Sequence, residues 1–326
     1  MNTLYPLTFK PLFKDKLWGG QKIKQHLGLN TGSLPNCGEA WLLSGVDGNP
    51  TIIANGYLAG NELNELCEVF MGDLLGEKVY ERFGGQFPIL VKVIDSNDWL
   101  SIQVHPDDAL AQQRGSGYGK TEMWYAMQAD EGARLICGFN RPMDQPTYLE
   151  YLNSGKLPEI MNYEQVEQGD VFYIPAGRVH ALGPGLLIAE IQQTSDITYR
   201  IYDWDRVDDK GNPRELHTDL ALEAIDFTMH TQYKTPYNKT ENKPQQLVRS
   251  PFFTTNLLKL LSPVHTNYDG LDSFVILMCS SGACRISGEG QVINLKSGEV
   301  VLLPNLAKQV SIYPENECVI LEVYIE

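Results

Sequence analysis

The sequence predicts a mainly β protein with a sandwich or jelly-roll architecture. Most of the chain consists of short stretches rich in β-branched and aromatic residues, each bounded by turn-forming residues such as Gly, Pro or Asn. This is the pattern of many short strands joined by turns. Helical periodicity occurs in only a few places. At 326 residues the chain exceeds the usual size of one domain, so we expect two domains or a duplicated one.

The expected elements follow from these patterns along the chain. Strands are predicted at residues 51–56, 87–94, 133–139, 170–175, 186–193, 198–204, 273–282, 284–290, 299–304 and 318–325. Helices are predicted at residues 61–71, 74–83, 106–114, 145–154 and 214–228. Residues 11–20 end in Trp18 and two glycines and show no regular period, so we expect a structured loop there.

A polar stretch divides the chain. Residues 231–250 contain two prolines and no hydrophobic period, which predicts a boundary between a domain at 1–235 and one at 245–326. A weak repeat supports a duplicated architecture: "GDVFYIPAGRVH" from Gly169 to His180 has the same Gly-to-Pro spacing as "GEVVLLPNLAKQ" from Gly298 to Gln309. Each copy predicts a turn, a strand and a loop that returns a side chain inward.

Charge and composition limit the function. Lys+Arg 26 against Asp+Glu 41 gives a net charge of −15, which argues against binding to nucleic acid or an anionic membrane. A phosphorylated ligand would need a local cationic pocket. The sequence shows neither a signal peptide nor a long apolar run, which predicts a soluble cytoplasmic protein. The 6 cysteines form no C-x-x-C pair, which favours reduced thiols.

Two polar side chains occur where hydrophobic alternation would usually place an aliphatic pair. Gln103 and His105 are two positions apart in "SIQVHPDD" and so share one face of an extended segment. The later stretch with Gly169, Pro175, Gly177 and His180 resembles the second conserved motif of the cupin superfamily, whose members are double-stranded β-helix jelly rolls. In cupins that histidine meets ligands from an earlier strand motif.

Here the earlier motif would comprise Gln103, His105 and Glu122, which meet His180. Two imidazoles, one carboxylate and one amide oxygen suit a divalent ion such as Zn²⁺. Taken singly, a histidine is more often a hydrogen-bonded structural residue, and Glu122 could be a solvated carboxylate. The remaining histidines, His26, His217, His230 and His265, sit in no comparable pattern and are expected to be structural.

A narrower resemblance extends over nearly the whole chain. The strings "LSIQVHPDD", "GKTEMWY", "GDVFYIPAGRVHAL" and "IAEIQQTSDITYRIYDW" occur in this order, and together they resemble type I mannose-6-phosphate isomerases, also called phosphomannose isomerases, in their short bacterial form. The second half of the chain is the least diagnostic part, and we expect it to be a degenerate cupin domain.

The resemblance implies a zinc-dependent aldose–ketose isomerase that interconverts mannose 6-phosphate and fructose 6-phosphate through an enediol. It implies one Zn²⁺ per chain with the metal positions Gln103, His105, Glu122 and His180. It also implies catalytic and substrate-binding residues at Arg200, Lys120, Glu190, Ser101 and Asp196. Ser101 matches a phosphate contact. Glu190, Lys120 and a metal-bound water remain open as the proton-transfer group.

Other interpretations of the same residues remain open. Arg200 could stack on Trp204 or pair with Asp203 or Asp196, and Lys120 could be a solvated loop lysine. Two histidines and a carboxylate also describe the non-haem Fe(II) site of a cupin dioxygenase. A non-catalytic, metal-stabilised sugar-binding cupin is the third alternative.

Overall fold

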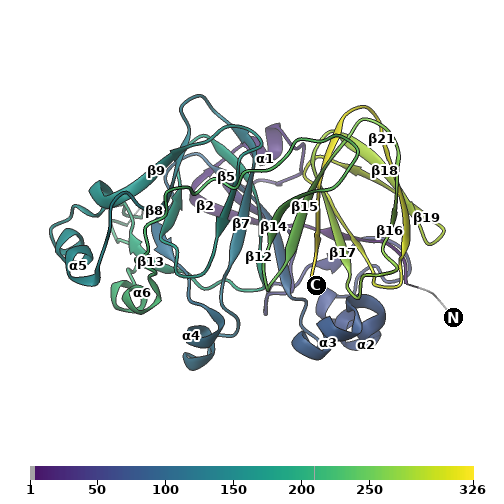
Figure 1. The fold of residues 1–326 in the computed structure, drawn as a ribbon, viewed down its shortest axis with the longest axis horizontal. Coiled ribbons are helices and arrows are strands. Elements are labelled where there is room, and N and C mark those ends of the chain that lie inside the picture. Colours follow the sequence, from purple (N-terminus) through teal and green to yellow (C-terminus); the bar gives the residue numbers. More distant parts are fainter. Residues whose placement is uncertain (1–3, 209) are drawn as a thin grey trace.

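The protein is built from four antiparallel sheets stacked as layers (Figure 1), as seen in a computed structural model that describes residues 4–208 and 210–326. Two sheets form the first half and two form the second half, so the predicted mainly β architecture with two jelly-roll halves is confirmed. Within the described residues, no helix is long and apolar enough to cross a membrane.

The first half contains two facing sheets. The six-stranded sheet contains, in order, β10 (Val171–Ile174), β7 (Glu122–Ala129), β12 (Leu186–Gln193), β5 (Ile89–Ser96), β2 (Leu12–Gly20) and β3 (Cys37–Leu43). The five-stranded sheet contains β13 (Tyr199–Tyr202), β6 (Ile102–Val104), β11 (His180–Leu182), β8 (Arg134–Phe139) and β9 (Met161–Gln165).

The second half also contains two sheets. The seven-stranded sheet contains, in order, β14 (Gln245–Arg249), β15 (Thr254–Leu260), β22 (Cys318–Tyr324), β17 (Val275–Ser281), β20 (Val300–Leu303), β1 (Leu7–Lys10) and β4 (Ile52–Ile53). The four-stranded sheet contains β16 (Val264–Asn267), β21 (Gln309–Pro314), β18 (Ala283–Gly288) and β19 (Gln291–Lys296). Strands from the start of the chain therefore complete a sheet of the second half.

The helices are short and lie outside the sheets (Figure 1). They are α1 (Lys22–Gln25), α2 (Leu63–Leu75), α3 (Glu77–Phe83), α4 (Asp108–Gln113), α5 (Gln145–Asn153), α6 (Thr218–Ala224) and the 3-10 helix η1 (Leu157–Ile160). Side-chain caps begin two of them, because Asp107 accepts from the Leu110 N–H at 2.8 Å and Asp144 accepts from the Thr147 N–H at 2.9 Å. The predicted helix at 214–228 is confirmed only over α6.

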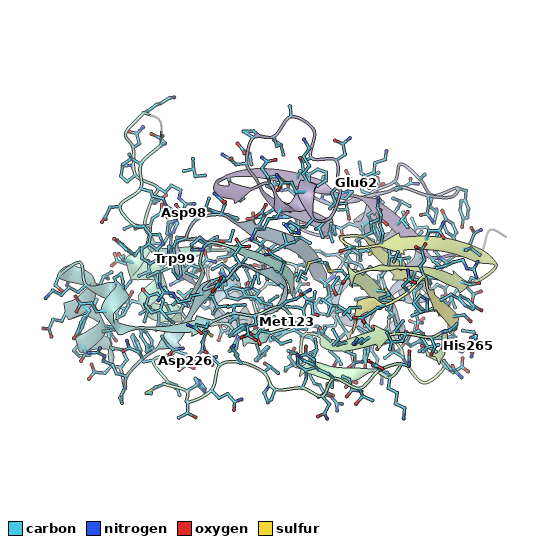
Figure 2. All side chains as sticks on the ribbon, turned by 90° about the horizontal axis from the view of Figure 1, so that it is seen from above. Glu62, Asp98, Trp99, Met123, Asp226 and His265 are labelled. Atoms are coloured by element: carbon cyan, nitrogen blue, oxygen red, sulfur yellow. The ribbon has the colours of Figure 1, made fainter. Side chains whose placement is uncertain are left out.

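The largest core cluster lies between the two halves. Leu187, Ala189 and Ile191 on one face of β12 belong to the same cluster as Ile276 and Leu302 of the seven-stranded sheet. Figure 2 shows side chains filling this region, with Met123 of the same cluster near the middle of the molecule. Each fully buried aliphatic side chain contributes about 1.5–3 kcal/mol, so this apolar layer holds the halves together.

One sequence interpretation was wrong. Residues 11–20 contain strand β2 rather than a loop. The register between β2 and β3 shifts between Lys14 and Asp15 and again before Gly20, which breaks the alternation that would identify a strand. A Cβ on Gly19 would lie 2.5 Å from the backbone nitrogen of Gly38, so the close approach of these two strands requires glycine.

The two repeat copies fold alike but end differently. Gly169 and Gly298 have φ values of 90° and 81° and lie in the turns before β10 and β20. In the first copy His180 is buried and points inward, as predicted. In the second copy Gln309 is exposed, so the expected inward side chain is absent at this position.

Removing apolar volume between the halves should destabilise the protein. Leu302 is completely buried, and we expect Leu302→Ala to lower the free energy of unfolding by about 2–5 kcal/mol. Denaturant midpoints with fitted slopes measure this. The matched control is Leu306→Ala, because Leu306 is 48% exposed. Equal midpoint shifts for the two variants would contradict the assigned role of this core.

Candidate active site and metal centre

The two sheets of the first half face each other with polar residues on their inner sides. On the five-stranded sheet, Gln103 of β6 is paired with His180 of β11 on one side and with Arg200 of β13 on the other. These three residues therefore form one row across the sheet. Because Ile102 and Val104 alternate with Gln103 and belong to the outer core cluster, the row faces the opposite sheet.

The facing sheet contributes acidic and basic residues by the same alternation. Glu190 of β12 is paired with Lys92 of β5 and with Trp124 of β7, and Glu122 begins β7 two residues before Trp124. Met123 and its alternating neighbours on β7 instead join the core between the halves. The inner face of this sheet thus carries buried charges directly behind an apolar layer.

Three of the predicted metal positions form one buried group. The ligand atoms of His105, Glu122 and His180 all lie within 4.8 Å of one another. His105 Nε2 lies 3.6 Å from Glu122 Oε2, and His180 Nε2 lies 3.4 Å from Glu122 Oε1. All three side chains are almost completely buried. The fold therefore brings together residues that are distant in sequence, as the cupin resemblance predicts.

The backbone fixes both imidazole rings. His105 Nδ1 lies 2.7 Å from the Ile197 carbonyl oxygen, and His180 Nδ1 lies 2.7 Å from the Arg178 carbonyl oxygen. A carbonyl only accepts, so each Nδ1 carries the proton and each Nε2 presents its lone pair to Glu122. Burial, followed by the Lys120 charge, lowers the pKa of His105 well below its usual value. Burial lowers the pKa of His180 to about 3.

The contact between His180 and Glu122 fits a metal ion. His180 Nε2 and Glu122 Oε1 are both acceptors, and the latter is buried without a hydrogen-bond partner in the part of the chain that the structure describes. Two acceptors facing each other in a buried site need a cation between them. Because the lowered pKa of His180 prevents its protonation near neutral pH, the donor set suits a divalent metal.

Lys120 lies inside this group rather than in solvent. Its Nζ lies 2.9 Å from His105 Nε2 and 2.7 Å from Glu122 Oε2, and the residue is 4% exposed. Lys120 is also 4.0 Å from Glu190 Oε1. The ammonium group therefore compensates part of the carboxylate charge and connects the His–Glu–His group to the pocket, which argues against a solvated loop lysine.

Gln103 is oriented through its amide nitrogen. Its Nε2 lies 3.2 Å from His180 Nε2, and its Oε1 lies 3.5 Å from the Ser101 hydroxyl. The nitrogen can donate to the unprotonated His180 Nε2, but a metal ligand would have to be the oxygen. A half-turn of the amide would present that oxygen, so the role of Gln103 as a fourth ligand stays a prediction.

The remaining predicted residues meet around one pocket. Glu190 accepts a hydrogen bond from Trp124 Nε1 at 2.7 Å and pairs with Lys92 at 2.8 Å. The pocket lining includes six of the predicted site residues: Ser101, Gln103, Lys120, Glu190, Asp196 and Arg200. Two of these lining residues contact the metal-site group. Lys120 contacts His105 and Glu122, and Gln103 contacts His180. Asp196 is exposed, whereas Ser101 is buried.

Arg200 reaches the pocket without the partners considered from sequence. Its Nη1 donates to the Glu215 carbonyl oxygen at 2.8 Å, and its Nε is buried without a hydrogen-bond partner among the described residues. Asp203 is held instead by Arg206 and Arg214. Among the described residues, the Arg200 guanidinium does not stack on the Trp204 ring. The Trp204 indole instead lies 5.1 Å from the Trp99 ring, measured between ring centroids. The guanidinium therefore retains donors for a ligand.

Sequence reasoning missed several charged residues of this pocket. Lys92 lies inside the apolar stretch "FPILVKVI", and Glu39 lies inside "GEAWLL". A charge within an apolar strand needs a buried partner, so this signal was available for both. Burial alone would lower the pKa of Lys92, but the carboxylates of Glu190, Glu39 and Glu122 outweigh it and raise that pKa. Arg214, in a polar loop, gave no such signal.

The fold and this buried donor group define a cupin-type protein with a group of side chains that could hold a metal ion. Residues 7–137 match the catalytic domain of phosphomannose isomerase type I. The chain is 32% identical to the mannose-6-phosphate isomerase of Streptococcus mutans, covering 93% of each chain. It is 32% identical to ManA, a mannose-6-phosphate isomerase of Bacillus subtilis, over 98% of this chain and 99% of that one.

A solved structure gives the same relationship. The crystal structure of mannose 6-phosphate isomerase from Bacillus subtilis has a TM-score of 0.86 and 31% sequence identity, covering 98% of this chain and 99% of that chain. The chain belongs to the type I phosphomannose isomerase family. The family resemblance stated from the sequence motifs is thereby confirmed.

The metal site can be tested by removing one imidazole. We expect His180→Ala to lose stoichiometric divalent metal, because the variant keeps only one imidazole and one carboxylate of the group. Metal content after dialysis, measured by mass spectrometry of the purified protein, checks this. His265→Ala is the matched control, since His265 is exposed and outside the group. Full metal content in the His180 variant would refute the assignment.

Proposed function

We infer that this chain is a mannose-6-phosphate isomerase that interconverts mannose 6-phosphate and fructose 6-phosphate. Family membership over almost the whole chain carries this conclusion. The buried His–Glu–His group beside a pocket whose lining includes Lys120, Arg200 and Arg214 supports it. The similarity to isomerases over nearly the whole chain argues against the two alternative functions, a cupin dioxygenase and a non-catalytic sugar-binding cupin.

We propose Zn²⁺ as the metal, one ion per chain. His105, Glu122 and His180 would hold it, with the Gln103 amide oxygen as a fourth ligand after rotation of the amide. A bound zinc ion would supply a Lewis acid that polarises oxygens of the substrate. Nitrogen and oxygen donors of this kind suit zinc. The hydrogen bonds from the two histidines to backbone carbonyls support the proposal, because they fix the rings in a ligating orientation.

We propose that Glu190 moves the proton between C2 and C1. Its carboxylate lines the pocket and is oriented by Trp124 and Lys92, so it can take a proton from one carbon and return it to the next. Lys120 and Arg200 would donate hydrogen bonds to the oxygens that gain negative charge in the enediol. Ser101 and Asp196 would bind the remaining polar groups of the phosphosugar.

The catalytic function belongs to the first part of the chain in this proposal. Every residue assigned above lies within residues 1–235, which we propose as the catalytic cupin domain, and residues 245–326 form the degenerate domain. The metal-site group found among the described residues lies in the first part. Strand β1 nevertheless pairs with β20, so the two parts share a sheet. A cytoplasmic location stays a prediction from the sequence.

The function is tested by a coupled assay of mannose 6-phosphate conversion to fructose 6-phosphate. Purified protein should turn over before chelator treatment, lose activity after it, and regain activity when Zn²⁺ is added. Protein incubated with chelator and then dialysed with Mg²⁺ is the control. No turnover by metal-replete protein would refute the isomerase assignment, and activity that survives complete metal removal would refute the role of the metal.

Arg200 can be separated from the metal site by substitution. We expect Arg200→Ala to keep its metal but to lower kcat by about 10²–10³-fold, the usual effect of removing one preorganised donor. Steady-state kinetics and metal analysis on the same preparation measure both quantities. Arg141→Ala is a suitable control because Arg141 is exposed and outside the pocket. A near-normal kcat would show that Arg200 is structural.

A further inference from the structure

The lysines that line the pocket have carboxylate partners. They pair as follows: Lys92 with Glu190 at 2.8 Å, Lys120 with Glu122 at 2.7 Å and Lys16 with Glu39 at 3.2 Å. Their charges are therefore balanced within the protein. Two arginines, Arg200 and Arg214, also line the pocket. Among the described residues, the Arg200 guanidinium donates to the Glu215 carbonyl oxygen and has no carboxylate partner, so any surplus positive charge lies at the arginine end.

One buried carboxylate serves the arginines at that end. Asp203 accepts from Arg214 Nε at 2.7 Å and Nη2 at 2.5 Å, and from Arg206 Nη2 at 2.6 Å. Its side chain is 5% exposed. The other carboxylate near Arg206 is Asp98, which lies 3.5 Å away and is 57% exposed. Two guanidinium groups thus share one buried negative charge.

The positive charge of Arg214 repels the Arg200 guanidinium. Burial lowers the pKa of the Arg200 guanidinium, and repulsion from the Arg214 charge lowers it further. An anion placed between the two would relieve that repulsion. This local excess stands out because the whole chain carries a net charge of −15. An anionic ligand, rather than a neutral sugar, is what such a local field attracts.

The arginine end lies away from the metal-site group. Arg200 pairs with Gln103, and Gln103 pairs with His180, so Arg200 is two strand spacings, or about 10 Å, from His180 along the sheet. Tyr202 pairs with Ile102, and the next residues outward are Asp203 and Ser101. The Asp203–Arg214 pair therefore lies beyond Arg200 along β13, on the strand two spacings from His180.

We propose that Arg214, held in position by Asp203, binds the phosphate group of the substrate and selects for phosphorylated hexoses. The inference rests on the proposed isomerase function. The phosphate lies at the far end of the six-carbon chain from C1 and C2, so a pocket with the metal group at one end and Arg214 at the other matches the substrate. Arg214 uses Nε and Nη2 on Asp203, which leaves further guanidinium donors for phosphate oxygens.

Arg206 provides a matched control. It binds the same Asp203 oxygen as Arg214 but does not line the pocket. A purely structural role for Arg214 in neutralising Asp203 would make the two arginines equivalent. A phosphate-binding role makes only Arg214 matter for the substrate. Asp203 is then a positioning residue, because it fixes the Arg214 guanidinium without contacting the substrate.

The test compares Arg214→Gln with Arg206→Gln in the full-length, zinc-loaded protein. Inorganic phosphate is the probe, and its dissociation constant is measured by calorimetry. We expect Arg214→Gln to weaken phosphate binding and to raise the KM for mannose 6-phosphate at least tenfold, since a charged hydrogen bond is lost. Arg206→Gln should change both by less than about threefold. Arg214→Lys keeps the positive charge but loses the paired donors of the planar guanidinium. It should therefore bind phosphate more tightly than Arg214→Gln but more weakly than the unsubstituted protein.

The outcomes separate this inference from the isomerase assignment. Phosphate binding that depends on Arg214 supports the anion site whether or not the protein turns over mannose 6-phosphate. Unchanged phosphate binding and KM in Arg214→Gln would overturn the inference while leaving the isomerase function intact. Equal effects in the Arg206 and Arg214 variants would also overturn it. Unfolding midpoints of each variant show whether a loss arises from the fold instead.

Discussion

Burial of the six-stranded sheet on both faces is the constraint that organises this protein. One face of β12 packs Leu187 and Ile191 into the core between the halves, and the other presents Glu190 to the pocket. Successive side chains of a strand point to opposite faces of the sheet, so one strand can supply both the apolar core and the polar pocket. A register shift of one residue would exchange the two faces, so the apolar layer and the polar site specify each other. The second half thereby acts as the support on which the site is built.

Because the polar face is buried, its charges must be matched locally. Glu190 meets Lys92, and Glu122 meets Lys120. Removing one member of such a pair leaves an uncompensated buried charge. Glu122 Oε1 also faces the unprotonated His180 Nε2 without a hydrogen-bond donor among the described residues, and a bound cation would compensate this contact. Where Arg200 and Arg214 line the pocket, the anionic group of the proposed phosphosugar substrate would supply the matching negative charge.

Local patterns in the sequence were sufficient for the strands and for part of the site. The expected strand at 186–193 is β12 itself, and the spacing from Gly169 predicted the inward His180. Pairing between distant segments was not predictable, because no local pattern shows that β1 would join β20. The orientation of the Gln103 amide and the position of Lys120 against His105 also arise only in the folded chain. Strand β2 was missed because its register with β3 shifts twice, which breaks the alternation that identifies a strand.

The central claim is that a metal ion joins the two facing sheets at His105, Glu122 and His180. Anomalous diffraction at the zinc edge from crystals of zinc-loaded protein tests this most directly. The account predicts one strong peak between His105 Nε2, His180 Nε2 and a Glu122 carboxylate oxygen, at distances of about 2.0–2.2 Å. A structure with no peak there, or with the ion bound elsewhere, would contradict it.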